Sequence, residues 1–321
     1  MNDLKDFRIG WFATILGSGG VALASLQYFP LLSTLLAYIL TAIFIVLSVL
    51  WLIKIVLYPE VVKEEIKHFV IGNYYPLQPI SAVILSLLYY RLSIPLEKPL
   101  LVYGAVAIFI FTVYILYNFF ATTTAELHHI HGGWFIPPVS TILVTYAMLL
   151  EYQPSLLTLT TSLVFFGIGL MLFLFIATIL FLRLVSHELP AAELAPTNFI
   201  LLAPVGILIL DFMKIANFAS KLLPNAEALP AIFFIISLSL WGFGVWALIV
   251  NIMILLKYLK QEYPFFLGWW SYVFPIAAFT IGTAALSTQV DALSYISGIL
   301  YGFLLVIWAV VSLNTLKILL K

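Results

Sequence analysis

The sequence predicts an all-α integral membrane protein of ten transmembrane helices, arranged as five hairpins around a central pore lined by the odd helices. Of its 321 residues, 64% are hydrophobic and 9% are charged, whereas soluble domains carry about a quarter charged residues. Apolar runs long enough to span a bilayer recur along the chain. Interior prolines then divide these runs into two alternating kinds. We expect residues 1–321 to form a single transmembrane domain, because no stretch is long and polar enough for a second.

Composition also excludes several classes of function. The formal net charge is zero, so nothing indicates a nucleic-acid partner. The chain has no cysteine, which excludes disulfides, thiol catalysis and cysteine-ligated metals. It contains neither a G-x-x-x-x-G-K-[ST] phosphate loop nor a G-x-S-x-G nucleophile motif. We therefore expect no enzyme and no cofactor.

The first two hairpins follow from hydrophobic runs between charged or Pro/Gly-marked breaks. Spans 7–27 and 31–57 end at the charged stretch PEVVKEEIKH, which forms either an amphipathic surface helix or a solvated connector. MNDLKDFRIGW lacks the positive n-region and cleavage site of a signal peptide, so it is interpreted as leading into the first span. Spans 76–92 and 98–124 end at AELHHIHGG.

Three further hairpins complete the chain. Spans 134–152 and 160–186 end at SHELPAAELAP, spans 196–221 and 228–258 follow, and spans 264–288 and 292–319 come last. The odd spans thus recur about every 60 residues, as in a repeat of helical hairpins.

Interior prolines are confined to the odd spans, at Pro79, Pro137, Pro138, Pro204 and Pro275. A broken membrane helix is tolerated where protein or a water-filled cavity satisfies the freed backbone groups. We therefore expect the odd helices to face an interior and the even helices to face lipid or neighbouring protein. The alternative is that these prolines only shape helix packing.

Small and hydroxyl-bearing residues also follow one another along the odd spans at helical spacing. Close helix packing uses the same residue types, but several such lanes together favour a narrow conduit. The predicted pore-lining residues are Gly17, Gly20, Pro79, Ser86, Pro138, Thr141, Thr145, Thr197, Pro204, Ser271 and Pro275.

Phe274 is the predicted gate of this pore. Pro275 cannot donate a hydrogen bond to the carbonyl of Ser271, and its ring bends the helix there. Phe274 then projects into a lane of small residues, and an apolar ring in a pore gates by blocking and dewetting. The alternative is that Phe274 faces lipid.

Asp211 and Lys214 are the clear charges within the spans, three residues apart on one helical face. They are predicted to form an ion pair, and the alternative is that Lys214 binds substrate. A cation pathway normally displays intramembrane carboxylates. Their scarcity here favours anions, which backbone N–H groups and hydroxyls can stabilise without tight binding.

The segment AELHHIHGGW carries Glu126, His128, His129 and His131. Its spacing does not match H-E-x-x-H, in which two histidines share one face of a helix. We expect interfacial hydrogen bonding or pH sensing and no bound metal.

Positive charge predicts the orientation. With the N-terminus inside, ten Lys and Arg side chains fall on the inner side and four on the outer. Both termini are therefore expected in the cytoplasm, with the chain spanning the cell membrane.

Four motifs together resemble the tellurite-resistance/dicarboxylate transporter family, which includes slow-type anion channels and fungal malate and sulfite transporters. They are FRIGWFATILGSGG, GGWFIPPVST, APTNFILLAPVG and WWSYVFPIAAFT. The resemblance implies a homotrimer in membrane lipid, with one pore per protomer occluded by a phenylalanine beside a proline or glycine. Phe274, beside Pro275, matches that residue.

Two functions follow as expectations. The first is a channel or facilitator for small anions of the chloride, nitrate, sulfite or malate class. The alternative is a proton-coupled carrier or exchanger for a C4-dicarboxylate such as malate, or for sulfite, which needs a titrating group. Asp211, Lys214, Glu126 and the histidines are the candidates for that group.

Overall fold

The computed structural model describes residues 2–121, 126–260 and 263–320, and the regular elements of these segments are helices. Within them, nine helical segments are long and apolar enough to cross a membrane. They coincide with nine of the predicted spans, although residues 122–124 of span 98–124 lie outside the described residues. The other predicted span, 76–92, matches α5 (Leu77–Leu92), which has only 16 residues.

The helices fall into a short set and a long set that alternate along the chain. The short set, of 16 to 21 residues each, is α2 (Phe12–Tyr28), α5 (Leu77–Leu92), α7 (Ile136–Glu151), α9 (Leu202–Leu222) and α11 (Trp270–Leu286). The long set, of 25 to 31 residues each, is α3 (Pro30–Leu57), α6 (Glu97–Ala121), α8 (Leu156–Ser186), α10 (Leu229–Leu259) and α12 (Ala292–Leu319).

Burial separates the same two sets. The spans that contain α2, α7, α9 and α11 are 67–78% buried, whereas those of the five long helices are 17–33% buried. In α5, every residue from Leu77 to Tyr89 is buried. The long helices expose Leu, Ile, Val and Phe side chains, as expected of a surface that faces hydrocarbon. We call the two sets the inner and outer helices.

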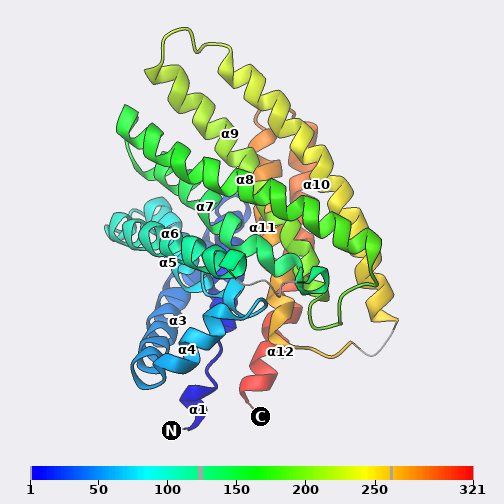
Figure 1. The fold of residues 1–321 in the computed structure, drawn as a ribbon. Coiled ribbons are helices and arrows are strands. Elements are labelled where there is room, and N and C mark those ends of the chain that lie inside the picture. Colours follow the sequence, from blue (N-terminus) through cyan, green and yellow to red (C-terminus); the bar gives the residue numbers. More distant parts are fainter. Residues whose placement is uncertain (1, 122–125, 261–262, 321) are drawn as a thin grey trace.

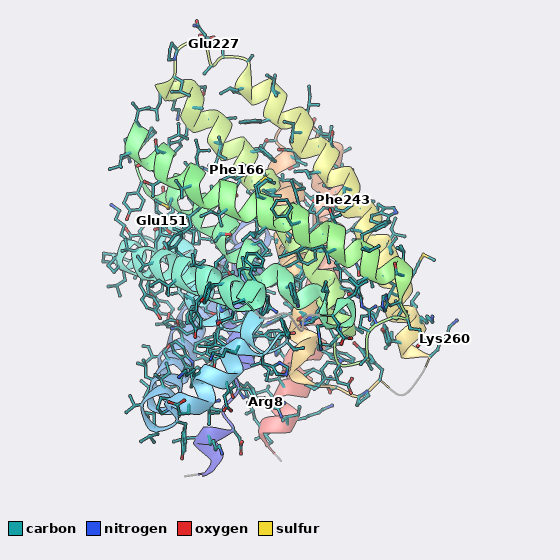
Figure 2. The ribbon with its side chains drawn as sticks, in the orientation of Figure 1. Arg8, Glu151, Phe166, Glu227, Phe243 and Lys260 are labelled. Carbon is teal, nitrogen blue, oxygen red and sulfur yellow. The ribbon has the colours of Figure 1, made fainter. Side chains whose placement is uncertain are left out.

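The inner helices pack in a closed ring. Helix α2 contacts α5, α5 contacts α7, α7 contacts α9, α9 contacts α11, and α11 returns to α2. Each inner helix also packs against the outer helix that follows it in the chain. Both chain ends lie at one end of the molecule (Figure 1). Figure 2 shows Arg8 near that end and Glu227 at the opposite end.

Every inner helix begins after a short 3-10 turn. These turns are η1 (Ile9–Trp11), η2 (Gly72–Tyr74), η4 (Gly132–Phe135), η5 (Ala195–Leu201) and η6 (Leu267–Trp269). Pro79, Pro137, Pro138 and Pro204 lie within the first turn of their helices, where a missing N–H costs little. Pro275 is different, because it stands inside α11. It is thus the proline that interrupts a helix in the way the sequence predicts.

Hydrogen bonds from tryptophan and tyrosine side chains connect outer helices to inner helices. Trp308 on α12 donates to Ser18 Oγ at 3.0 Å, and Trp241 on α10 donates to Thr283 Oγ1 at 3.0 Å. Tyr28 on α2 bonds to Ser297 on α12 at 2.6 Å. Such bonds satisfy polar groups that hydrocarbon cannot solvate.

The charged stretch after α3 forms the helix α4 (Pro59–Lys67) and braces the end where the termini lie. Lys54 is 1% exposed, and its Nζ donates to Glu65 Oε1 at 2.7 Å and to the Phe7 carbonyl at 2.8 Å. Tyr75 donates to the other oxygen of Glu65 at 2.7 Å. The Glu65 carboxylate on α4 therefore bonds to α3 through Lys54 and to the turn before α5 through Tyr75, and Lys54 in turn bonds to the N-terminal segment.

Candidate functional site

Three cavities follow one another between the ends of the inner ring. The proximal cavity, nearest the termini, has a volume of about 540 Å³ and is lined in part by Arg8, Glu193 and Ser271. The distal cavity measures about 460 Å³ and includes Arg91 and Tyr146. A central gap of about 40 Å³ lies between them.

Shared residues establish this order. Ala13, Tyr74 and Ser271 line both the proximal cavity and the central gap. Phe274 lines both the central gap and the distal cavity. Phe274 is therefore the wall between the gap and the distal cavity.

The Phe274 ring is held by an inner-ring contact. Its side chain is 6% exposed. A Cβ placed on Gly20 of α2 would stand 3.1 Å from Phe274 Cδ2 and 2.9 Å from the Cβ of Ala277. The absence of a side chain at Gly20 thus makes the room that the ring occupies.

The central gap is lined by uncharged side chains. Leu16, Ile80, Val139 and Ile200 contribute apolar surface from four inner-ring segments. Ser271 and Pro275 contribute from α11, next to Phe274. Its volume of about 40 Å³ is far below the roughly 460 and 540 Å³ of the neighbouring cavities. An ion in this gap would lose much of its hydration shell.

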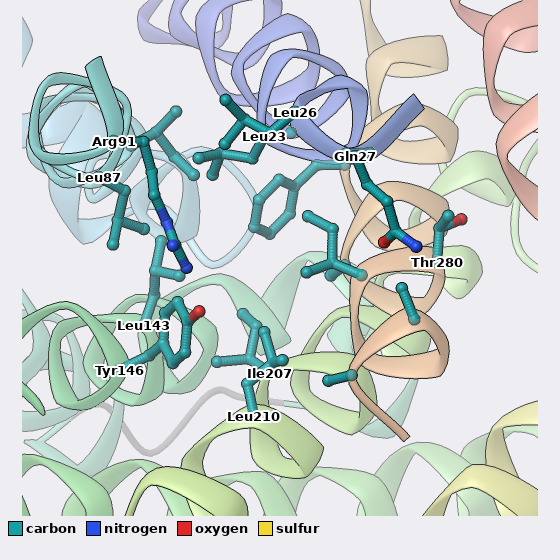
Figure 3. Close-up of a pocket in the computed structure, with 18 of the residues that line it drawn as sticks. Leu23, Leu26, Gln27, Leu87, Arg91, Leu143, Tyr146, Ile207, Leu210 and Thr280 are labelled. Atoms are coloured by element: carbon teal, nitrogen blue, oxygen red, sulfur yellow. The ribbon is translucent and has the colours of Figure 1, made fainter. Parts of the chain in front are cut away.

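The two larger cavities carry charge in different ways. The proximal cavity is lined by Lys5 and Arg8 together with Asp6, Glu65 and Glu193. Among the described residues that line the distal cavity, Arg91 is the charged one. Figure 3 shows the Arg91 side chain directed toward Tyr146, with Gln27 and Thr280 on another wall. The distal cavity therefore presents a single cation among apolar and neutral polar groups.

Predicted lining residues of α2 and α11 lie at these cavities. Gly20 borders the distal cavity, Ser271 borders the proximal cavity and the central gap, and Pro275 borders the gap. Gly17 instead faces α11, where a Cβ would stand 2.7 Å from Trp270 Cε3.

The other predicted lining residues lie outside the linings of the three cavities. The cavities are bordered instead by Ile80 and Leu87 of α5 and by Val139 of α7, each one position after a predicted residue, and also by Ile84 and Leu143. The residues outside the linings are Gly17, Pro79, Ser86, Pro138, Thr141, Thr145, Thr197 and Pro204.

The threonine hydroxyls outside the cavity linings form hydrogen bonds to backbone carbonyls. Thr141 Oγ1 donates to the Pro138 carbonyl at 2.8 Å, and Thr197 Oγ1 donates to the Leu194 carbonyl at 2.6 Å. Thr145 Oγ1 donates across to the Ser162 carbonyl of α8 at 3.3 Å. These hydroxyls satisfy helix carbonyls within the protein, as membrane helices favour.

Asp211 and Lys214 do not form an ion pair. Within the described chain the ion pairs are Lys54–Glu65 and Lys63–Glu60. Asp211 is fully buried, and neither carboxylate oxygen has a hydrogen-bond partner among the described residues. A charged carboxylate in this position would bear a large desolvation cost.

Two polar residues at the distal end escaped the sequence interpretation. The sequence predicts Arg91, within span 76–92, only as one of the positive charges on the outer side, and it predicts no role for Glu151 at the end of α7. Glu151 is 6% exposed and accepts a hydrogen bond from Ser86 Oγ, while its Oε2 lacks a partner in the described structure. The sequence feature that could have identified both residues is a charged side chain in the last turn of an odd span.

The histidine segment has a structural arrangement. His131 is 1% exposed, and its Nδ1 accepts the Gly133 N–H at 3.0 Å. Burial and the nearby Arg183 lower the His131 pKa to about 3. The ring of His129 stacks on Phe69, whereas the His128 side chain lies outside the described residues. Over the described chain, no three His, Asp or Glu side chains gather as a metal site would require.

Comparison with known proteins places this arrangement in a family. A "voltage-dependent anion channel" family model matches residues 6–316. A protein of Methanocaldococcus jannaschii named an uncharacterized transporter is 30% identical over 98% of this chain and 95% of its own length. A second such transporter of that organism is 28% identical over 97% and 93%. A sulfite efflux pump of Arthroderma otae is 22% identical over 91% of this chain and 84% of the pump. The chain belongs to the voltage-dependent anion channel family of membrane transport proteins.

Proposed function

We propose that this protein passes small anions across the cell membrane through the three aligned cavities, with Phe274 as the gate. The observation that carries the proposal is that Phe274 forms the wall shared by the central gap and the distal cavity. An apolar ring at such a place blocks the path and excludes water. The gate is closed in this conformation.

The charge distribution supports an anion as the passenger. Arg91 supplies a positive charge at the distal mouth, and the described residues that line the gap offer no fixed charge that would hold an ion. Passage with weak binding suits fast, poorly selective flux, because an ion must leave as readily as it enters. The candidate substrates are chloride, nitrate, sulfite and malate.

The architecture proposed with this function is a single domain, residues 1–321, of ten membrane helices in five hairpins around the inner ring. The closed ring of α2, α5, α7, α9 and α11 supports it. The charge asymmetry supports cytoplasmic termini, with the proximal cavity facing the cytoplasm. A homotrimer in membrane lipid, with one path per protomer, completes the proposal. Transport is its activity, and no enzymatic step is proposed.

The lining residues of this path are proposed from the cavities. Gly20, Ser271, Phe274 and Pro275 border it. Gly17, Ser86, Thr141, Thr145 and Thr197 are assigned to packing between helices, and so are Pro79, Pro138 and Pro204.

A voltage clamp of purified protein in planar bilayers tests the proposal. Wild type and Phe274→Ala are placed under gradients of chloride, nitrate, sulfite and malate in turn. We expect the reversal potential to follow the anion gradient. Reversal that tracks the cation instead would contradict the proposal.

Arg91→Gln tests the distal mouth in the Phe274→Ala background. A charge about 4 Å from an ion is worth ~1 kcal/mol in bulk water, so we expect current to fall roughly fivefold. Lys221→Gln is the matched control, because Lys221 is exposed near the same end and lies outside the cavity linings. Equal currents in the two variants would show that Arg91 does not act on the passing anion.

A second candidate is a proton-coupled carrier or exchanger for sulfite or a C4-dicarboxylate such as malate. The sulfite efflux pumps among the relatives favour it, and so does Asp211. A buried carboxyl without a partner in the described structure is suited to taking up and releasing a proton during transport. Lys214 is only partly buried and is the alternative substrate contact.

Radiolabelled uptake separates the two candidates. A carrier predicts saturable, pH-dependent uptake of sulfite or malate, no channel current in Phe274→Ala, and loss of proton coupling in Asp211→Asn. A channel predicts uptake that rises with membrane potential and is unchanged in Asp211→Asn.

A further inference from the structure

A lateral groove lies between two outer helices, away from the proposed path. It has a volume of about 360 Å³, within the range of ~300–1,000 Å³ typical of small-molecule sites. Leu180 and Leu184 of α8 form one wall, and Trp246 and Val250 of α10 form the other. Phe135 and Asn198 also line it, from the turns that precede α7 and α9. The groove is thus apolar, with an amide among its lining groups.

The Asn198 amide has unmet hydrogen-bonding capacity. Its side chain is 3% exposed, and neither Nδ2 nor Oδ1 has a hydrogen-bond partner among the described residues. Asn251, which lines the same groove, provides a contrast because its Nδ2 donates to the Ala247 carbonyl at 2.9 Å. Burying an unpaired amide is unfavourable in a protein interior. A ligand hydroxyl could accept a hydrogen bond from Asn198 Nδ2 and donate one to Oδ1, and a ligand carbonyl oxygen could accept from Nδ2.

A polar pocket continues the groove toward the end where the termini lie. It is lined by Lys257 and Tyr258 of α10 and by residues 188–192, among which Glu188 brings a negative charge beside the positive charge of Lys257. Lys257 follows the groove residue Ile254 by one turn of α10, and residue 188 follows Leu184 by four positions. Figure 2 shows Phe243, another groove residue, farther up α10 and Lys260 at this end of it. Both flanking segments therefore pass from apolar to polar within about one helical turn.

We propose that this surface binds one anionic membrane lipid of the leaflet on the side of the termini. Its acyl chain fills the groove, and a hydroxyl or carbonyl oxygen near the headgroup meets the Asn198 amide. The lipid phosphate lies at Lys257, and a headgroup hydroxyl donates to Glu188. Lysine at a membrane surface extends its ammonium group to the polar layer and attracts anionic lipid. The proposal depends on the membrane location of the chain and is independent of the anion path.

Native mass spectrometry of delipidated protein tests the site. The probes are phosphatidylglycerol and phosphatidylcholine with identical acyl chains. We expect one phosphatidylglycerol per chain to bind saturably, and about tenfold more weakly in Asn198→Leu. Lys257→Gln should remove the preference for phosphatidylglycerol over phosphatidylcholine.

Two substitutions on another outer helix serve as controls. Asn314→Leu replaces an α12 asparagine whose Nδ2 already donates to the Val310 carbonyl at 2.8 Å, and Lys317→Gln removes an exposed lysine of the same helix. Both should bind as wild type does. Binding that is linear in lipid concentration, or is equal in Asn198→Leu and Asn314→Leu, would overturn the proposal.

Thermal unfolding in lipid-free detergent separates lost binding from misfolding. Replacing an unpaired amide with an apolar side chain of similar size is neutral or stabilising, so Asn198→Leu should melt at or above the wild-type temperature. Phosphatidylglycerol should then raise the melting temperature of wild type more than that of the variant. An equal rise in both proteins would count against the site.

Cross-linking addresses coverage by a second copy of the chain. Because the protein has no cysteine, Phe181→Cys places a single thiol beside the groove, on a side chain that is 59% exposed. We expect no disulfide-linked dimer in lipid bilayers. Efficient dimer formation together with absent lipid binding would assign the groove to a protein interface instead.

Discussion

Replacing Phe274 with alanine is the most direct perturbation of the proposed gate. The substitution removes the ring that separates the central gap from the distal cavity. Gly20 has no side chain to fill the vacated volume. The gap of about 40 Å³ should therefore join the distal cavity of about 460 Å³.

The size of the effect follows from hydration. An ion that crosses the intact gap sheds much of its water, and the effective penalty for a poorly solvated ion in a protein is several kcal/mol. If removing the ring restores about 3 kcal/mol of that hydration, the rate rises about 100-fold, because ~1.4 kcal/mol corresponds to tenfold. The expected current per channel is therefore about 100 times that of wild type.

Single-channel recording at equal protein amounts measures this, with Phe279→Ala as the matched control. Phe279 stands on the same helix and is 1% exposed, but it packs against Gly244 of α10. Both variants lose buried aromatic surface, at a typical cost of ~3–5 kcal/mol, and only one opens the path. Equal currents in wild type and Phe274→Ala, or an equal rise in Phe279→Ala, would refute the reasoning.

Three further predictions concern stability. Gly206→Ala should lower the thermal midpoint strongly, because a Cβ there would collide with backbone atoms of Ala278 that cannot rotate away; a midpoint equal to wild type would contradict this packing. Lys54→Met should destabilise by about 3–5 kcal/mol, since it leaves Glu65 without its buried partner, and adding Glu65→Leu should recover much of the loss in a double-mutant cycle. His131 stabilises the fold when neutral, because burial lowers its pKa to about 3 from an unfolded value near 6.5. That stability is fully present above pH ~6.5 and is lost as the pH falls toward 3. The loss is about 2 kcal/mol at pH 5. Unfolding measured against pH should show a shallower acid loss in His131→Asn, and parallel curves would argue against the assignment.

Much of the fold was predictable, because hydrophobic runs and proline placement report directly on burial. Nine predicted spans match helices that can cross a membrane, and the odd/even distinction appears as inner and outer helices. Span 76–92 was also predicted to within one residue of α5, although its 16 residues leave it the inner helix outside the set of nine. The family was also predictable, since four ordered motifs identified it and the family match confirmed it.

Residue type did not predict which face of α5 and of α7 borders the cavities. Small and hydroxyl residues suit a conduit and a helix contact equally, and in both cases they recur at the same spacing. The structure turns Thr145 toward α8 and brings Leu143 to the distal cavity. Which face lies inward depends on neighbouring helices, which a single sequence does not specify.

The predicted ion pair between Asp211 and Lys214 was wrong for a related reason. Asp211 and Lys214 are three residues apart, a spacing that permits contact on a helix. Asp211 is instead fully buried, while Lys214 remains partly exposed. Glu151 was missed because its partner, Ser86, belongs to a different inner helix and is distant in sequence.

The short central gap also determines how a membrane potential acts on this protein. Conducting water in the proximal and distal cavities would carry little of the voltage drop, so the electric field is concentrated across the thin layer at Phe274. A single charge crossing 100 mV exchanges ~2.3 kcal/mol with that field. Every described side chain lining the gap is uncharged, so the field there does its work on the passing anion and exerts no net force on the ring. In the proposed path, membrane potential at this layer therefore sets the rate of passage, and opening the ring requires a different stimulus.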